Sequence, residues 1–348
     1  MQAFQRVLKP TMTALVGLLF SGALAQDLPA DKPQTAAATY LNPIGNPPIH
    51  LQEPFILVYA KQYYLFGTAS PTEGFQCYES SDLVHWKLDG WAWHKSGLRV
   101  AKGELHSPQV FVHSGMFYMV YSGRMPTGTQ LALAASVKPE GPYHDLHVPW
   151  LDLGGSCSGG DVFVDNNGKA YLTFSRKSTT NGCSYSAIYG VALSKDLSKT
   201  TGQTLKLLEA NQLWELAHRD LNQCNDFSRI LRIGANYYLT YSANDHLSAD
   251  CGIGYAVADR PLGAWTKSAQ NPLLASHPES GLFGPAHGSV FRSVDRTEWF
   301  IAYDSLTDPS NHPADRVVNI GTLMLQPDGK LGVKGLTPSP VRSPAFRR

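Results

Sequence analysis

The feature that most constrains this chain is a pattern that recurs five times along it. Each copy has a strand rich in β-branched residues, a short turn, and a strand rich in aromatic residues. The copies span residues 55–67, 110–121, 162–174, 230–241 and 290–303. Most of the turns hold Gly, Asn, Asp or another small polar residue, as tight β-hairpins require. Self-similarity at a period of 53 to 67 residues indicates a repeat architecture.

A second hairpin follows the first in most copies, with closing segments at 80–86, 191–197, 256–265 and 320–329. Two hairpins per repeat give four strands, which is one blade of a β-propeller. No long helical periodicity interrupts the pattern. A β-sandwich of similar length is the alternative, but a sandwich would not repeat on this period. We therefore expect an all-β fold, a five-bladed β-propeller, over residues 46–348.

The N-terminus carries the pattern of an export signal. Arg6 and Lys9 precede the apolar stretch Ala14–Leu19, and Ala23-Leu24-Ala25 fits a small-x-small cleavage site. The apolar run is too short to span a bilayer, so we expect a signal peptide over 1–25 rather than a membrane anchor. Residues 26–45 are rich in Pro, Ala and Thr and are expected to form a linker or a closing arm. The mature protein is expected to be periplasmic or secreted, with no membrane contact.

Composition narrows the partners. The net charge is +1 and only 16% of residues are charged, which argues against nucleic acid, because phosphate binding needs a strongly basic face. Aromatic residues make up 11% of the chain. Their flat faces suit sugar rings, although aromatic residues also fill β-rich cores. We expect a monomer that binds an oligosaccharide or a polysaccharide.

An oxidising compartment permits disulfides, and the chain has five cysteines. Cys157 and Cys183 flank one predicted hairpin, and Cys224 and Cys251 flank another. Folding a hairpin brings its two ends close together, so we expect these two pairs to be bridged and Cys77 to be free. There is no Cys-x-x-Cys pair, which makes zinc an unsuitable partner.

In a propeller the innermost strand of each blade begins at the central channel. These strand starts carry Glu53, Gln109, Asp161, Asp226 and His287. Acidic residues are disfavoured in strands, so local folding does not explain three of them at corresponding places. Such residues can also cap turns or bind water in a polar channel. We expect all five near the channel mouth, where they would form a site.

Three acids in one channel have a known chemical use. Hydrolysis of a glycosidic bond needs one protonated carboxylic acid for the leaving oxygen and one carboxylate as base or nucleophile. A third acid nearby can raise the pKa of the protonated group. The strand starts therefore favour a glycosidase.

Six segments carry a resemblance to a known family. They are Glu53-Pro-Phe-Ile-Leu with Tyr63-Tyr-Leu-Phe-Gly-Thr68, Ser81-Asp-Leu-x-x-Trp86, Val162–Leu172, Tyr237–Asn244, Pro261–Lys267 and Gly284–Ser289. In this order they resemble glycoside hydrolase family 43 over nearly all of the mature chain. The resemblance implies a five-bladed propeller that acts on arabinose- or xylose-containing glycans with inversion.

The resemblance also implies roles for the acids. Glu53, before Pro54, matches the family's base, which is normally Asp. Asp226 matches the family's acid, which is normally Glu. The Asp that modulates the acid's pKa falls on Gly159, and Asp161 lies two residues further on the same strand face. We therefore expect Glu53 as base, Asp226 as acid and Asp161 as the third catalytic carboxylate.

Other positions depart from the family or carry weaker signals. Gln109 stands where the family has Glu, and Asp304 stands where a His often follows the fifth blade's Tyr. The resemblance implies no obligatory cofactor, and it makes His287 a candidate ligand for a calcium or sodium ion in the channel. Candidate substrate-binding residues are Gln109, His106, Trp91 and Arg316, although Trp91, with Trp93, could equally pack between blades.

Three interpretations remain open at this point. The chain is an active hydrolase with exchanged carboxylates, a relative that acts on a different sugar or linkage, or a propeller that only binds sugar.

Overall fold

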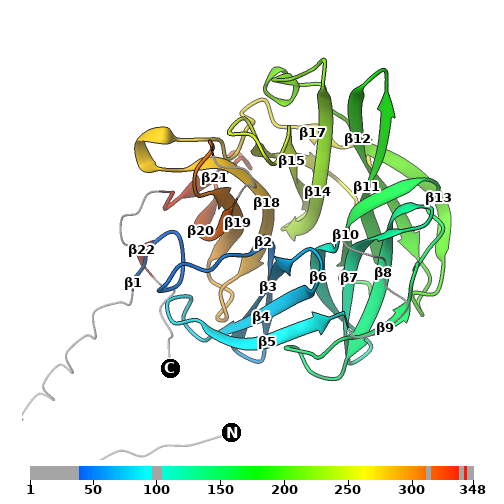
Figure 1. The fold of residues 1–348 in the computed structure, drawn as a ribbon, viewed down its shortest axis with the longest axis horizontal. Coiled ribbons are helices and arrows are strands. Elements are labelled where there is room, and N and C mark those ends of the chain that lie inside the picture. The colour runs from blue at the N-terminus through cyan, green and yellow to red at the C-terminus, as the bar shows by residue number, and fades with distance from the viewer. Residues whose placement is uncertain (1–38, 96–103, 311–314, 337–340, 343–348) are drawn as a thin grey trace, which may run out of the picture. The chain divides into compact units, whose positions relative to one another are not determined.

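Strands provide nearly all the regular structure, and they group into five four-stranded antiparallel blades (Figure 1). The structure, a computed structural model, describes residues 39–95, 104–310, 315–336 and 341–342. The chain divides into two units, 1–36 and 37–348, and all described residues belong to the second. The predicted signal peptide lies outside the described residues, as does the predicted arm up to residue 38.

The blades follow one another along the chain. Blade 1 contains β2 (Gln52–Tyr59), β3 (Gln62–Ser70), β4 (Gly74–Ser80) and β5 (Lys87–His94). Blade 2 contains β6 (His106–His113), β7 (Met116–Met125), β8 (Gly128–Ser136) and β9 (His144–His147). Blade 3 contains β10 (Ser156–Val164), β11 (Ala170–Thr180), β12 (Cys183–Leu193) and β13 (Thr200–Leu208).

The remaining elements complete the ring. Blade 4 contains β14 (Asn222–Ile233), β15 (Asn236–Ala243), β16 (Gly252–Ala258) and β17 (Thr266–Lys267). Blade 5 contains β18 (Phe283–Arg292), β19 (Trp299–Leu306), β20 (Arg316–Leu325) and β21 (Leu331–Lys334). Two short 3₁₀ helices, η1 (Leu213–Leu216) and η2 (Pro278–Ser280), lie between blades 3 and 4 and blades 4 and 5 along the chain. Among the described residues no helix is long and apolar enough to cross a lipid bilayer.

The first strand of each blade contacts the first strands of its neighbours, from β2 through β6, β10, β14 and β18 back to β2. These strands therefore surround a common centre, as the sequence predicts for a five-bladed propeller (Figure 1). Blades 3 and 4 are also joined directly, because the long β11–β12 hairpin brings Ser184–Ser186 into parallel pairing with Asn222–Cys224.

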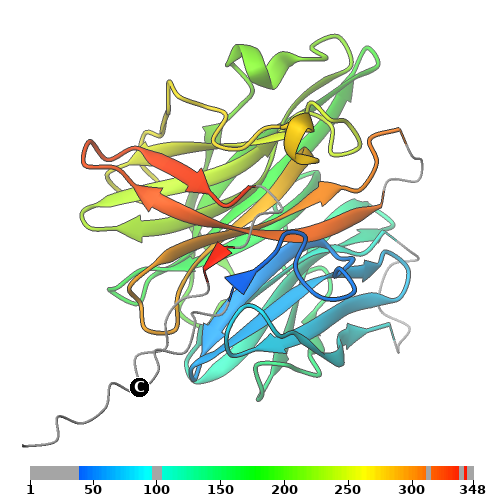
Figure 2. The same ribbon diagram turned by 90° about the vertical axis from the view of Figure 1, so that its left-hand side faces the viewer.

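The chain closes on itself beside blade 5. β1 (Thr39–Tyr40) pairs with β22 (Val341–Arg342), and both short strands are visible in Figure 2. The following segment runs along β20, where Ile44 donates its N–H to Val318 and Val318 donates to Ile49. The Asn42 side chain adds a hydrogen bond to the Ile320 carbonyl. These bonds hold the two ends of the described chain together.

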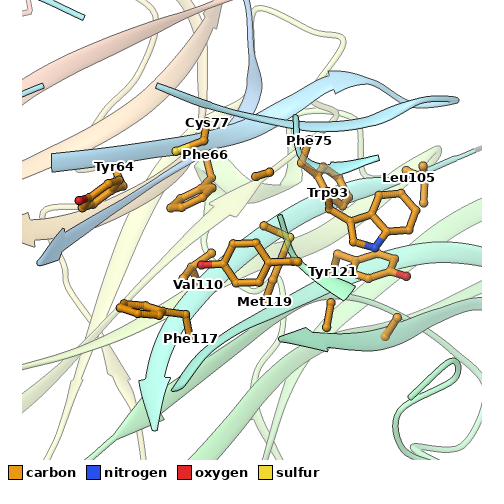
Figure 3. Close-up of a cluster of buried hydrophobic side chains, with 14 of the residues drawn as sticks. Tyr64, Phe66, Phe75, Cys77, Trp93, Leu105, Val110, Phe117, Met119 and Tyr121 are labelled. Atoms are coloured by element: carbon orange, nitrogen blue, oxygen red, sulfur yellow. The ribbon is translucent and has the colours of Figure 1, made fainter. Parts of the chain in front are cut away.

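The hydrophobic core is divided among the interfaces between blades. The cluster between blades 1 and 2 contains Phe66, Phe75 and Trp93 from one blade and Met119 and Tyr121 from the other (Figure 3). Similar clusters lie between each other pair of neighbouring blades. Because every blade buries an apolar face on both sides, the aromatic residues of the repeats serve mainly as core.

The two predicted disulfides are wrong: all five cysteines, each within the described residues, are free thiols. Cys157 stands opposite Arg176 on β11, whereas Cys183 stands opposite Thr180, four residues further along the same strand. That offset is roughly 13 Å of strand, well beyond the roughly 7 Å that a bridge allows. Cys224 and Cys251 lie at the ends of β14 and β16, with β15 between them, so two strand spacings of roughly 5 Å separate them.

Candidate active site

A β-bulge marks the start of every innermost strand. Two residues of that strand stand opposite one residue of its partner, at 53–54, 107–108, 159–160, 227–228 and 287–288. The first residue of each pair has φ between 52° and 61°, and these residues are Glu53, Ser107, Gly159, Phe227 and His287. A left-handed first residue is a known bulge geometry that glycine adopts without steric cost. Four of the five blades therefore accept backbone strain at the channel mouth, which is common at functional sites.

The bulges show that the five predicted strand-start residues are not equivalent. Glu53 and His287 occupy the left-handed position, Asp226 precedes it by one residue, and Gln109 and Asp161 follow it by two. The prediction of five corresponding positions at the channel mouth is therefore wrong for Gln109 and Asp161. The cause is the extra bulge residue, which shifts the register and cannot be counted from strand alternation.

A cavity of about 270 Å³ lies at the bulges. Of the predicted site residues, Glu53, Asp226, His106 and His287 line it, and we call these four the cavity layer. Gln109, Asp161, Trp91 and Arg316 do not line it. The structure thus brings two of the three predicted catalytic carboxylates, Glu53 and Asp226, to one cavity.

The Glu53 carboxyl group is 6% exposed. Its Oε2 accepts hydrogen bonds from the Thr68 hydroxyl at 2.8 Å and from the Ser107 backbone N–H. Its Oε1 has His106 Nδ1 as a neighbour at 3.7 Å, which is too far for a hydrogen bond. Burial lowers the pKa of His106, so this imidazole is neutral at neutral pH and leaves Oε1 without a cationic partner.

The Asp226 carboxyl group is held at both oxygens. Ser186 donates its hydroxyl to Oδ1, and the Lys177 ammonium lies 3.3 Å from Oδ2. Burial alone would raise the pKa of Asp226, but the Lys177 charge and the Ser186 hydrogen bond hold it below its usual value. Asp226 in turn raises the pKa of Lys177. Both members of this pair are therefore ionised at neutral pH.

Asp304 supports the cavity from beneath. This fully buried carboxylate accepts the Glu53 backbone N–H at 2.6 Å, His287 Nδ1–H at 2.8 Å and Arg316 Nε–H at 2.8 Å. Burial alone would raise the pKa of Asp304, but Arg316 and His287 hold it at about 2. Since the carboxylate can only accept, His287 carries its proton on Nδ1, which leaves Nε2 as its second polar atom.

Arg316, predicted to bind substrate, is instead part of this support. It is 2% exposed, and its guanidinium also donates to the carbonyls of Gly284 and His246. Its donors are used in holding Asp304 and two loops, so the prediction fails because Arg316 lies behind the cavity wall.

Asp161 and Gln109 belong to a second ring, which we call the inner layer. Its members come directly after the two bulge residues of each innermost strand. They are Phe55, Gln109, Asp161, Arg229 and Ser289. Asp161 pairs with Arg229 at 3.1 Å and accepts the Ile230 N–H. Gln109 accepts the Val162 N–H at 3.0 Å, and the Arg229 guanidinium lies 5.3 Å from the Phe55 ring centre. The inner layer therefore links neighbouring blades.

Trp91 lies on β5, the outermost strand of blade 1, where it is 39% exposed and packs against the His94 ring. Trp93, two residues on, is buried against Phe75 and Tyr121 and donates to Asp145. The prediction that Trp91 binds substrate therefore fails, because strand β5 is remote from the channel. Trp93 packs between blades, as the alternative allowed.

The residues near His287 do not fit the calcium or sodium ion that the resemblance allowed. Both Asp304 oxygens already accept hydrogen bonds from His287, Arg316 and Glu53. Calcium takes six to eight oxygen ligands. Within the described ranges no three His, Cys, Asp or Glu side chains are placed to hold a metal.

Several cavity residues were missed by the sequence analysis. Lys177 comes from β11, and Asn244 and His246 follow β15. The Asn244 amide donates to the Trp214 and Asp250 carbonyls, and its Oδ1 is buried with no hydrogen-bond partner among the described residues. Such an acceptor suits a substrate hydroxyl. Of these three residues, only Asn244 lies in a segment that the sequence analysis singled out, Tyr237–Asn244. Lys177 and His246 lie outside the strand starts and outside the family segments.

Five blades around a cavity that Glu53 and Asp226 line from different blades define a propeller of the glycosidase class. The chain matches Glycosyl hydrolases family 43 over residues 40–331 and belongs to that family. Members of this family are glycosidases, so the reaction class is hydrolysis of glycosidic bonds.

The curated relatives of this chain share about a quarter of its residues or fewer. A β-D-galactofuranosidase (xynD) of Aspergillus niger is 22% identical over 77% of this chain and 78% of its own length. An extracellular exo-α-(1→5)-L-arabinofuranosidase of Streptomyces avermitilis is 23% identical over 87% of this chain and 64% of its own length. A non-reducing end α-L-arabinofuranosidase of Bacteroides ovatus is 26% identical, and the match spans 48% of that protein.

Solved structures agree on the fold. The crystal structure of a thermostable family-43 glycoside hydrolase has a TM-score of 0.83 and 35% identity, with 88% of this chain and 99% of that chain covered. An endo-1,4-β-xylanase from Bacteroides thetaiotaomicron has a TM-score of 0.71 and 26% identity, with 88% and 98% covered.

Proposed function

We propose that this protein releases terminal arabinose or xylose units from plant-type glycans, with inversion at the anomeric carbon. The observation that carries the proposal is that Glu53 and Asp226, from blades 1 and 4, line one cavity. A cavity of about 270 Å³ is at the small end for ligand sites, which favours one terminal sugar over a long chain. Two of the relatives are named for exo or non-reducing-end action, in agreement.

Glu53 and Asp226 are the acid–base pair of this proposal. By position, the resemblance gives Glu53 the role of base and Asp226 that of acid. An acid must carry a proton before the bond breaks, and Lys177 opposes protonation of Asp226. Asp161 takes a supporting role only, because Arg229 neutralises its charge one layer below the cavity. Asn244 Oδ1 and His287 Nε2 are proposed to accept hydrogen bonds from the sugar hydroxyls.

The test is hydrolysis of aryl α-L-arabinofuranosides, aryl β-D-xylosides and branched arabinoxylan oligosaccharides, with the product anomer followed by proton NMR. Inversion is expected for whichever substrate is cleaved. Glu53→Gln and Asp226→Asn are expected to abolish turnover of the oligosaccharide while sugar binding persists. Glu279→Gln and Asp220→Asn, at exposed positions remote from the cavity lining, serve as matched controls with unchanged rates.

Two other outcomes discriminate the alternatives. Cleavage of an aryl galactofuranoside alone would move the protein to another sugar, as the name of the Aspergillus relative allows. Calorimetric binding of oligosaccharides without turnover of any glycoside would make the propeller a binding module.

Export is part of the proposal as well. It rests on the basic, apolar and small-residue pattern of residues 1–25, which lie outside the described residues. N-terminal sequencing of the protein recovered from the periplasm or medium is expected to begin at Gln26. Recovery of an uncleaved chain in the cytoplasm would contradict export.

A further inference from the structure

Three carboxylates line the cavity, and the exposed Glu104 is paired with Arg124. The other two, Glu53 and Asp226, differ in how many of their oxygens are engaged. Both oxygens of Asp226 have a donor, the Ser186 hydroxyl on one and the Lys177 ammonium on the other. Hydrogen bonds and a cation at both oxygens favour the ionised form. A carboxylate that is ionised in the resting enzyme can accept a proton from water, but it has no proton to give to a leaving group.

Glu53 presents one free oxygen. Its two donors, Thr68 and Ser107, both meet Oε2, so Oε1 is the atom on which a proton can reside. The nearest ring nitrogen, on His106, is 3.7 Å from Oε1 and belongs to a neutral imidazole. The side chain is 7% exposed, and among the described residues no ammonium or guanidinium is within ion-pair distance of it. Asp304, a fixed anion, is bonded to its backbone N–H.

We propose that the catalytic roles are exchanged between the blades: Glu53 is the general acid and Asp226 is the general base. The proposal rests on the proposed glycosidase function. Residue types follow the same exchange, since the family's usual acid is Glu and its usual base is Asp, and here the Glu stands in blade 1 and the Asp in blade 4. Each role therefore stays with its usual residue type, and only the blade changes.

The reaction then balances as follows. Glu53 Oε1–H gives its proton to the glycosidic oxygen while the bond from that oxygen to the anomeric carbon breaks. A water molecule attacks the anomeric carbon from the opposite face, and its proton passes to Asp226. The products are an alcohol and a sugar of inverted configuration, with Glu53 ionised and Asp226 protonated. A proton transfer through solvent restores the resting state.

Lys177 acts as a positioning residue in this scheme. Its ammonium keeps Asp226 ionised in the resting enzyme and lies on the side from which water attacks. The leaving group accordingly departs on the Glu53 side, near His106 and Glu104, which also line the cavity. The sugar chain therefore enters from the blade 1–2 side of the cavity.

Leaving-group dependence tests the exchange. A variant that lacks the acid still cleaves a dinitrophenyl glycoside, whose leaving group needs no proton, whereas a variant that lacks the base loses both substrates. Glu53→Gln is expected to lower kcat/KM on an oligosaccharide by about 10²- to 10⁴-fold, and to stay within roughly tenfold of wild type on the 2,4-dinitrophenyl glycoside. Asp226→Asn is expected to lose at least about a hundredfold on both.

The reverse pattern, in which Asp226→Asn keeps the activated substrate, overturns the exchange. Equal loss of both substrates in Glu53→Gln also overturns it. A wild-type protein that turns over neither substrate contradicts the proposed function instead, so the two failures are distinguishable.

Lys177→Met provides a second readout through the pH profile of kcat/KM. The titratable or charged groups around the pair include Lys177, His106, His246, His287, Cys224, Glu104 and Asp304. Removal of the ammonium raises the pKa of Asp226, because its charge is what lowers it. If Asp226 is the base, the acidic limb moves to higher pH; if Asp226 is the acid, the basic limb moves instead, which contradicts the exchange. Lys169→Met, at an exposed turn, is the matched control.

Discussion

The cavity layer and the inner layer both lie on the innermost strands of the blades, yet their carboxyl groups differ in their partners. In the inner layer Asp161 is matched by the Arg229 guanidinium and by a backbone N–H. In the cavity layer Glu53 keeps one oxygen free. The cation of Asp226 is Lys177, whose side chain is 44% exposed. The buried Asp161–Arg229 pair therefore joins two blades, whereas in the cavity layer one acid lacks a cation and the other has a partly exposed one.

The largest effect should come from breaking the inner layer. Arg229→Met leaves Asp161 buried without its cation, and breaking such a pair typically costs about 3–5 kcal/mol. We expect a loss of that size in the urea unfolding free energy. The double variant Asp161→Leu/Arg229→Met should recover much of it, since no charge then remains buried. Equal instability of the single and double variants would show that packing, not the charge, holds this layer.

The next effect concerns the support beneath the cavity. The pKa of Asp304 is about 2, against an ordinary 3.8, so its ionised form stabilises the fold by about 2 kcal/mol. Because the folded pKa is depressed, this stabilisation is present above about pH 4 and is lost as the pH falls towards 2.

Asp304→Asn removes that contribution. The difference in unfolding free energy between wild type and Asp304→Asn should therefore shrink between pH 5 and pH 2.5. A difference that stays constant over this range would mean that Asp304 acts through shape rather than charge.

A smaller effect is expected at the hydroxyl that holds Glu53. Thr68→Val keeps the shape but removes the hydrogen bond to Oε2. One such bond contributes about 1 kcal/mol, so kcat/KM should fall roughly fivefold while the unfolding midpoint changes little. Steady-state kinetics on one aryl glycoside measures this. An unchanged rate would place Glu53 under the control of Ser107 alone.

The smallest effect is expected outside both layers. Trp91 is half exposed on β5, so Trp91→Ala should leave kcat and KM within about twofold of wild type. Its matched control is Trp93→Ala, which empties a core position and should cost about 3–5 kcal/mol of stability. A tenfold rise in KM for Trp91→Ala would restore the prediction that Trp91 binds substrate.

The sequence predicted the fold because hairpin turns and β-branched strands are local signals, and each blade repeats them. The strand starts of the repeat placed Glu53, Asp226 and His287 near the channel mouth, and all three line the cavity. His106 was predicted only as a candidate substrate-binding residue, and it also lines the cavity. The strand-start pattern misplaced Asp161 and Gln109 because a bulge adds one residue without a consistent sequence signal: Glu53, Ser107 and Phe227 are not residue types that favour a left-handed backbone.

Lys177 and Arg316 were beyond reach for another reason. The Lys177 ammonium meets Asp226 across 49 positions of chain, and Arg316 reaches Asp304 from a separate strand. Neither contact leaves a periodic signal, because each depends on how blades are placed around the ring. The wrong prediction of a Cys157–Cys183 disulfide arises because the β11–β12 hairpin is longer than the turn pattern indicates.

The repeated bulge has a consequence for how such a protein can evolve. Every blade has the same left-handed backbone position at the channel mouth, occupied here by Glu, Ser, Gly, Phe and His in turn. Since this position is defined by the backbone and not by its occupant, an acidic residue can be lost from one blade and gained in another without remodelling the scaffold. The direction in which a substrate binds can then change through substitutions at these positions, while the propeller around them stays the same.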